Sequence, residues 1–79
     1  MAKTVHRPEY HSLAALLKEA RLKADLTQGD LAQRLSRTQV YVSNVENAVR
    51  RLDVLELRDY CQALEVSLEK LLVRWERGL

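Results

Sequence analysis

Several residue types that define other protein classes are scarce in this sequence of 79 residues, which has one cysteine, one proline, two glycines and no phenylalanine. A single cysteine excludes a disulfide scaffold, and so little proline and glycine excludes collagen and low-complexity disorder. No apolar run approaches the roughly 20 residues that span a bilayer, and the opening Met-Ala-Lys-Thr carries no secretory signal. We therefore expect one small domain, residues 1–79, in a reducing cytoplasm and with no membrane partner.

Charge is nearly balanced overall but unevenly distributed. The formal net charge is +2. Residues 1–52 carry nine Lys or Arg against five Asp or Glu, whereas residues 53–79 carry four against six. This asymmetry is compatible with an ordinary solvated surface, and equally with a basic face for a polyanion and an acidic C-terminal face for a possible protein partner.

Helix starts recur along the chain. Pro8 suits the first turn of a helix that we expect to run to about Ala24. Thr27 with Asp30, and Asp53 with Glu56, have the spacing of a capping box, in which each partner satisfies a free backbone N–H of the other.

Two further helix starts have a cap without the acidic partner. Thr38 can cap a helix through about Asn47, and Ser67 a final helix, because a hydroxyl oxygen accepts from the free N–H groups of a first turn. The sequence therefore predicts five helices joined by short turns, an all-α domain. Cys61 falls on a predicted inward stripe with Val54, Leu57 and Leu64, so it is interpreted as a buried small hydrophobic residue.

The predicted third helix has an unusual outward face. Val42 and Val45 point inward by helical spacing, which leaves an almost uncharged surface formed by Gln39, Val40, Ser43, Asn44 and Asn47. Solvated helix faces favour Glu and Lys, whereas Gln and Asn side chains can pair with the major-groove edge of adenine. This face therefore favours DNA recognition.

The stretch LTQGDLAQRLSRTQVYVSNVENAVRRLDVLEL resembles the helix-turn-helix family of lambda-type phage repressors, Cro proteins and their bacterial relatives, the Cro/C1-type or XRE family. The matching features are Leu-Thr-Gln ending at Gln28, the small residue Ala32, and Tyr-Val-Ser-Asn-Val-Glu from Tyr41 to Glu46. The resemblance covers roughly residues 13–73. It implies a compact five-helix lambda-repressor-like domain with the helix-turn-helix at about 27–47.

The resemblance also implies roles for individual residues. Gln28 and Thr38 would bind backbone phosphate. Base edges would be contacted from the face of the third helix, and other residues would flank the groove or contact the backbone. The full predicted DNA-binding set is Gln28, Arg37, Thr38, Gln39, Val40, Tyr41, Ser43, Asn44, Asn47, Arg50 and Arg51. For Tyr41, a phosphate contact and packing against the second helix are equally good alternatives.

Two structural expectations come from the same resemblance. Arg21 and Glu46 occupy positions that form an ion pair between the first and third helices in the family. Relatives usually have glycine at helix ends where this chain has Asp25, Ser36 and Ala48. If those positions are left-handed, Ser and Ala each cost about 1 kcal/mol there.

The last helix, within 66–79, carries more apolar surface than docking on a small core requires. We expect Leu68 and Leu71 to face the core and Leu72 and Trp75 to form a homodimer interface. The reverse assignment is an alternative, and all four could instead complete the core of one chain. A two-fold dimer implies a near-palindromic operator, with half-sites roughly 10–10.5 base pairs apart or a multiple of that spacing.

Other chemistry has little support. His6 and His11 are out of helical register and no further ligands accompany them, so no metal site is predicted. No nucleophile triad or phosphate loop indicates an enzyme, and we expect no cofactor and no small-molecule ligand.

The function predicted from the sequence is a sequence-specific transcriptional regulator that binds double-stranded DNA, a dimeric repressor or autoregulator of bacterial or phage origin, associated with the nucleoid. Residues 1–7 would form a flexible arm. Two alternatives are a DNA-binding antitoxin and a protein-interaction adaptor that has lost DNA binding.

Overall fold

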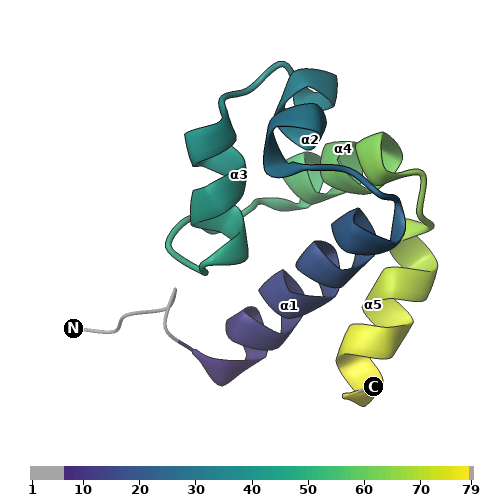
Figure 1. The fold of residues 1–79 in the computed structure, drawn as a ribbon. Coiled ribbons are helices and arrows are strands. Elements are labelled where there is room, and N and C mark those ends of the chain that lie inside the picture. Colours follow the sequence, from purple (N-terminus) through teal and green to yellow (C-terminus); the bar gives the residue numbers. More distant parts are fainter. Residues whose placement is uncertain (1–6, 79) are drawn as a thin grey trace.

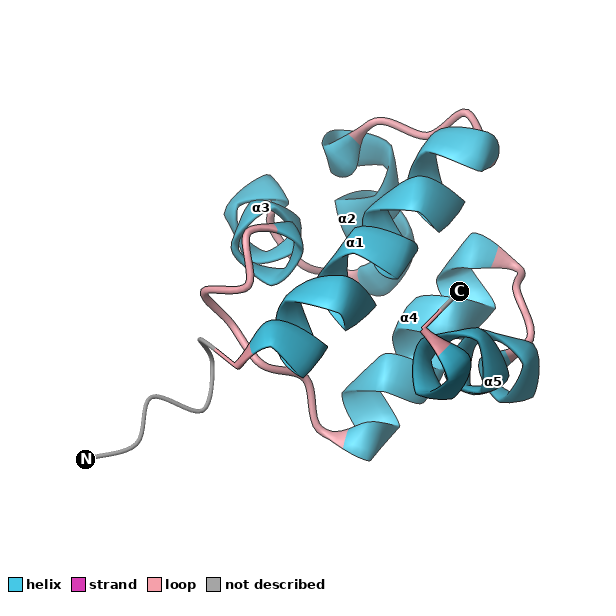
Figure 2. Ribbon diagram, turned by 90° about the horizontal axis from the view of Figure 1, so that it is seen from below, coloured by secondary structure: helices cyan, strands magenta, loops and turns pink. Residues whose placement is uncertain are grey.

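The computed structural model describes residues 7–78, and within them the chain forms five helices and no strand. The predicted all-α class is thus confirmed, while His6 and nearly all of the predicted arm lie outside the described residues. The helices are α1 (Pro8–Lys23), α2 (Gln28–Leu35), α3 (Gln39–Glu46), α4 (Val54–Leu64) and α5 (Leu68–Arg77). In both views α3 and α5 lie on opposite sides of α1 (Figures 1 and 2).

Side-chain caps define where four of the helices begin. Thr27 accepts from Asp30 N while its own N–H donates to the Asp30 carboxylate, both at 3.0 Å. Asp53 and Glu56 form the second capping box, with bonds of 2.9 and 2.8 Å. Thr38 and Ser67 supply simple hydroxyl caps to α3 and α5. Each bond satisfies an N–H that the helix itself leaves free, so the caps fix the starts that the sequence indicates.

The core is built from the inward stripes of all five helices. Its most deeply buried members, each at most 1% exposed, are Leu17, Leu31, Val42, Val45, Tyr60 and Cys61. Burial in these apolar surroundings raises the pKa of the Cys61 thiol, which agrees with its interpretation as a packing residue. The prediction that Val54 belongs to the inward stripe is wrong, because this residue is 69% exposed. It is the first residue of α4, and the opening turn of that helix extends past the core.

The turns between helices contain residues in the left-handed conformation. Asp25, Ser36 and Ala48 have φ of 60°, 55° and 60°, and Glu65 has φ of 59°. The first three are the positions at which the related sequences usually have glycine, so the turns keep the expected geometry at the cost of strain. The fourth position was not anticipated from the sequence.

Candidate DNA-binding site

The helix-turn-helix unit consists of α2, the turn through Ser36, and α3. Left-handed Ser36 reverses the chain within three residues, between Leu35 and the N-cap Thr38. The inward side chains of α3, Val42 and Val45, are completely buried. Because these two side chains anchor α3, its opposite face is held on the surface in a fixed orientation.

That opposite face carries no charged side chain and is mostly polar. Gln39 and Asn47 are exposed, and Val40 is 65% exposed. Ser43 and Asn44 are half-buried between them, and the Asn47 side-chain amide donates to Ser43 Oγ at 3.4 Å. Because Ser43, Asn44 and Asn47 have short side chains, a ligand bound to this face would approach the backbone of α3 closely.

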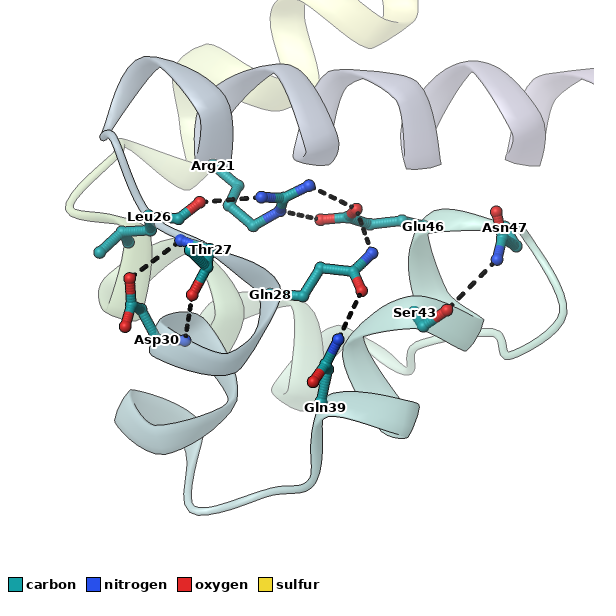
Figure 3. Close-up of polar contacts among 9 residues, drawn as sticks. All are labelled: Arg21, Leu26, Thr27, Gln28, Asp30, Gln39, Ser43, Glu46 and Asn47. Atoms are coloured by element: carbon teal, nitrogen blue, oxygen red, sulfur yellow. Dashed lines mark hydrogen bonds and ion pairs between the residues drawn. The ribbon is translucent and has the colours of Figure 1, made fainter.

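A buried ion pair joins α1 to the end of α3 (Figure 3). Arg21 donates from Nε and Nη2 to the two carboxylate oxygens of Glu46, at 2.6 and 3.0 Å, and from Nη1 to Leu26 O at 2.8 Å. The two side chains are 8% and 2% exposed. Hydrogen bonding to Glu46 raises the pKa of the Arg21 guanidinium, so this group stays charged. The structure thus brings together the two residues that the family resemblance pairs.

The same network extends to the start of α3. Gln28 donates its side-chain amide to Glu46 Oε1 at 3.1 Å, and its oxygen lies 3.5 Å from the Gln39 amide nitrogen. Figure 3 shows this chain of side chains running from Arg21 to Gln39. The last contact is long and therefore weak. Gln28, predicted as a phosphate ligand, is half-buried and uses its amide within the protein.

Basic side chains flank the outward face of α3. The Arg37 and Arg50 guanidinium carbons lie 4.6 and 5.1 Å from the ring centre of Tyr41. Glu56 of α4 pairs with both arginines. Tyr41 itself is half-buried and packs against the core. Its ring makes cation–π contacts with both guanidinium groups.

Tyr10 holds the loop that follows α3. Its hydroxyl donates to Arg50 O at 2.6 Å and accepts from Leu52 N at 3.1 Å, and the Arg51 guanidinium carbon lies 5.6 Å from its ring centre. Burial raises the pKa of this phenol, so the hydroxyl remains a donor at ordinary pH. The loop carrying Arg50 and Arg51 is therefore fixed to α1.

Sequence reasoning missed two residues of this surface, Glu56 and Tyr10. The sequence indicates only a capping role for Glu56, and nothing in its neighbourhood along the chain shows that it also contacts two arginines. Tyr10 precedes the matched part of the chain, and its partners lie 40 and 42 residues away. Their contacts depend on how helices dock, which no local pattern reports.

Residues 7–78 contain no group of three or more His, Cys, Asp or Glu side chains that could hold a metal ion. None of the helices in this described part of the chain is long and apolar enough to cross a membrane.

Comparison with known proteins identifies the family. The profile of the helix-turn-helix family matches residues 17–71. An XRE-family-like protein from Pseudomonas syringae pv. tomato is 46% identical, with a TM-score of 0.86 over 96% of this chain and 93% of that one. This chain belongs to the XRE family of helix-turn-helix proteins. No protein of curated function matches it significantly.

Two other solved structures resemble this XRE-family chain. The restriction-modification controller protein C.Esp1396I is 25% identical, with a TM-score of 0.83 over 91% of this chain and 95% of that one. It has also been solved as a tetramer in complex with its natural 35-base-pair operator. The clp gene regulator ClgR from Corynebacterium glutamicum is 23% identical, with a TM-score of 0.81 over 89% and 90% of the two chains, a likeness of fold alone.

Proposed function

We propose that this protein is a sequence-specific DNA-binding transcriptional regulator. The observation that carries the proposal is the outward face of α3, which is uncharged, presents Gln39 at its start and is flanked by Arg37, Arg50 and Arg51. Amides suit base edges in the major groove, and guanidinium groups suit the phosphates on either side. Family membership and the operator complex of C.Esp1396I support the same conclusion.

The residues divide into two groups by what they can contact. Gln39, Val40, Ser43 and Asn44 would meet base edges, with Val40 suited to a thymine methyl group. Gln28, Thr38, Tyr41, Asn47 and the three arginines would contact the backbone or flank the groove. Thr38 Oγ1 already accepts from Tyr41 N, at 3.2 Å, and its hydroxyl hydrogen remains for a phosphate oxygen.

The regulator would act as a homodimer on a near-palindromic operator, repressing or autoregulating transcription in the cytoplasm of a bacterium or a phage-infected cell. A dimer doubles the contact surface and matches its own two-fold axis to that of the operator. The partly buried side chains of α5, among them Leu72 and Trp75, would form its interface.

Selection of bound sequences from a random pool of DNA duplexes tests the proposal directly. We expect enrichment of one motif with two inverted half-sites, followed by binding of that duplex in a gel shift at moderate salt. Enrichment of no sequence, with no gel shift even at low salt, would contradict the proposal and favour the protein-interaction adaptor.

A further inference from the structure

The side chains around Tyr41 form a compact charged cluster, which consists of Arg37, Tyr41, Arg50 and Glu56. Glu56 Oε2 lies 3.8 Å from Arg37 Nη2 and 2.5 Å from Arg50 Nη2. The side chains of Arg37 and Arg50 are 47% and 41% exposed, whereas that of Glu56 is 21% exposed. One carboxylate oxygen therefore serves two arginines that reach it from the two ends of α3.

Glu56 is held in this position by a second interaction. Its other oxygen, Oε1, accepts from Asp53 N at 2.9 Å in the capping box of α4. Turning the carboxylate away from the arginines would break that bond and leave an N–H of the first turn without its partner. The negative charge is thus a fixed part of the surface beside α3.

A carboxylate and a phosphate compete for the same groups. Guanidinium N–H groups bind either anion through charge-assisted hydrogen bonds of similar geometry. While Glu56 occupies Arg50 Nη2 and lies close to Arg37 Nη2, the cluster offers fewer donors and less net positive charge to a DNA backbone.

We propose that Glu56 limits sequence-independent DNA affinity by acting as a counter-ion built into the protein for Arg37 and Arg50. The inference rests on the proposed DNA-binding function. Phosphate contacts supply essentially all of non-specific binding, and non-specific sites vastly outnumber an operator. A carboxylate at this position therefore keeps the protein from being held on random DNA.

The test replaces Glu56 with glutamine. Gln at the third helical position keeps an acceptor for Asp53 N, so the cap survives while the negative charge is lost. We expect E56Q to bind a random duplex several-fold more tightly at about 50 mM salt. The plot of log K against log salt should steepen by about 0.9 for each phosphate gained.

A matched control separates this effect from net charge. Asp25, between α1 and α2, is exposed, lies outside the proposed dimer surface of α5 and contacts none of the three residues that surround Glu56. Asn tolerates its left-handed conformation, so Asp25→Asn changes the total charge equally. We expect it to leave the salt slope unchanged. Adding Arg37→Ala and Arg50→Ala to E56Q should remove the gain, and thermal melts would show that every variant is folded.

The possible results are distinct. Unchanged or weaker binding by E56Q would overturn the inference, since a weaker complex would mean that the carboxylate holds the arginines in their binding positions. Equal tightening by E56Q and Asp25→Asn would also overturn it. If the wild-type protein bound no DNA at all, the proposed function would fall, and the inference with it.

Discussion

Of the ion pairs in the described part of the chain, the pair formed by Arg21 and Glu46 is the most deeply buried. Breaking such a pair leaves one charge without its partner in a poorly solvated site. We expect Arg21→Ala to destabilise the fold by about 3–5 kcal/mol, because Glu46 would retain only the amide of Gln28. Thermal unfolding of this variant and of Lys23→Ala provides the measurement.

Lys23 is the matched control because its pair with Glu19 is exposed, with side chains 73% and 39% accessible. Exposed pairs contribute under about 1 kcal/mol, so Lys23→Ala should melt close to wild type. A melting temperature for Arg21→Ala within a degree or so of wild type would show that the buried pair contributes little.

Two buried tyrosines offer a second comparison at this scale. The hydroxyl of Tyr10 bonds two backbone groups, whereas that of Tyr60 is buried with no hydrogen-bond partner. Tyr10→Phe leaves Arg50 O and Leu52 N without this partner and should cost about 1–3 kcal/mol. Tyr60→Phe removes a hydroxyl that is already unsatisfied and should be neutral or stabilising.

Denaturant unfolding gives the free energy of unfolding of both variants. The comparison is direct because each substitution removes a single hydroxyl group. Equal losses of stability would mean that the hydroxyl of Tyr10 contributes nothing specific to the loop after α3. The salt dependence of DNA binding should also change only in Tyr10→Phe, since Arg50 and Arg51 lie on that loop.

Sequence preference and general affinity should respond to different residues. Gln39 begins α3 and can accept from adenine N6 and donate to N7, so Gln39→Ala should cost about 1–3 kcal/mol on the preferred operator. It should relax the preference at one position per half-site with an unchanged salt slope. Arg51→Ala should instead flatten the plot of log K against log salt by about one unit per lost phosphate contact, and leave base preference intact.

Binding assays on the selected operator and on single-base variants, at several salt concentrations, distinguish the two behaviours. Full sequence preference in Gln39→Ala, together with its loss in Arg51→Ala, would place the base-reading residues in the loop after α3.

At the scale of the helices, strain is concentrated where each of the first four helices gives way to the next turn. Ser36 is exposed and has φ of 55°, a conformation that costs L-residues about 1 kcal/mol and glycine almost nothing. Ser36→Gly should therefore stabilise the fold by about 0.5–1 kcal/mol and raise Tm by a few degrees. Calorimetry of Ser36→Gly alongside Ala15→Gly checks this.

Ala15 is an exposed residue in the interior of α1, where glycine costs about 1 kcal/mol. The two substitutions to glycine should thus change Tm in opposite directions. A fall in Tm for Ser36→Gly would mean that its side chain makes a contribution larger than the backbone strain.

Sequence reasoning predicted helix starts better than helix ends. Starts depend on short-range bonds of residues such as Thr27 and Asp53, and these bonds form wherever the spacing is right. Ends depend on left-handed residues, and without glycine only the family resemblance drew attention to Ser36 or Ala48. Glu65 had no such signal.

In the candidate site, too, local features could be predicted from the sequence and contacts between distant residues could not. The outward face of α3 follows from helical periodicity, so Gln39 and Val40 could be placed from the sequence. The contacts of Glu56 and Tyr10 arise only after α4 and α1 have docked beside the end of α3. Periodicity places a side chain on a face of its own helix, and carries no information about which distant side chain meets it.

The molecule as a whole separates its two proposed surfaces. α3 and α5 lie on opposite sides of α1, so DNA and a second copy of the chain would not compete (Figure 2). Leu68, Leu72 and Trp75 are partly buried and line a shallow apolar groove on α5, while Leu71 of the same helix is buried and does not line it. Burial thus agrees with the predicted core position of Leu71, but it does not separate Leu68 from the predicted interface residues Leu72 and Trp75.

Sedimentation equilibrium tests the dimer. We expect a dimer at tens of micromolar protein, and a monomer after Leu72→Lys, because a charge placed in an apolar interface is costly to desolvate. Leu22→Lys is the control, since Leu22 is 58% exposed on α1 and does not line that groove. A wild-type monomer at these concentrations would contradict the proposal.

The indole of Trp75 is anchored across the molecule, with its N–H donating to Glu9 O at 2.7 Å. It is the single tryptophan of the chain, so fluorescence excited selectively in tryptophan comes from this one ring. Detachment of α5 from α1 would expose the indole to water and shift its emission to longer wavelength, and pairing of two α5 helices would alter the same signal with protein concentration. The protein thus carries its own optical probe for folding and for assembly, without any added dye.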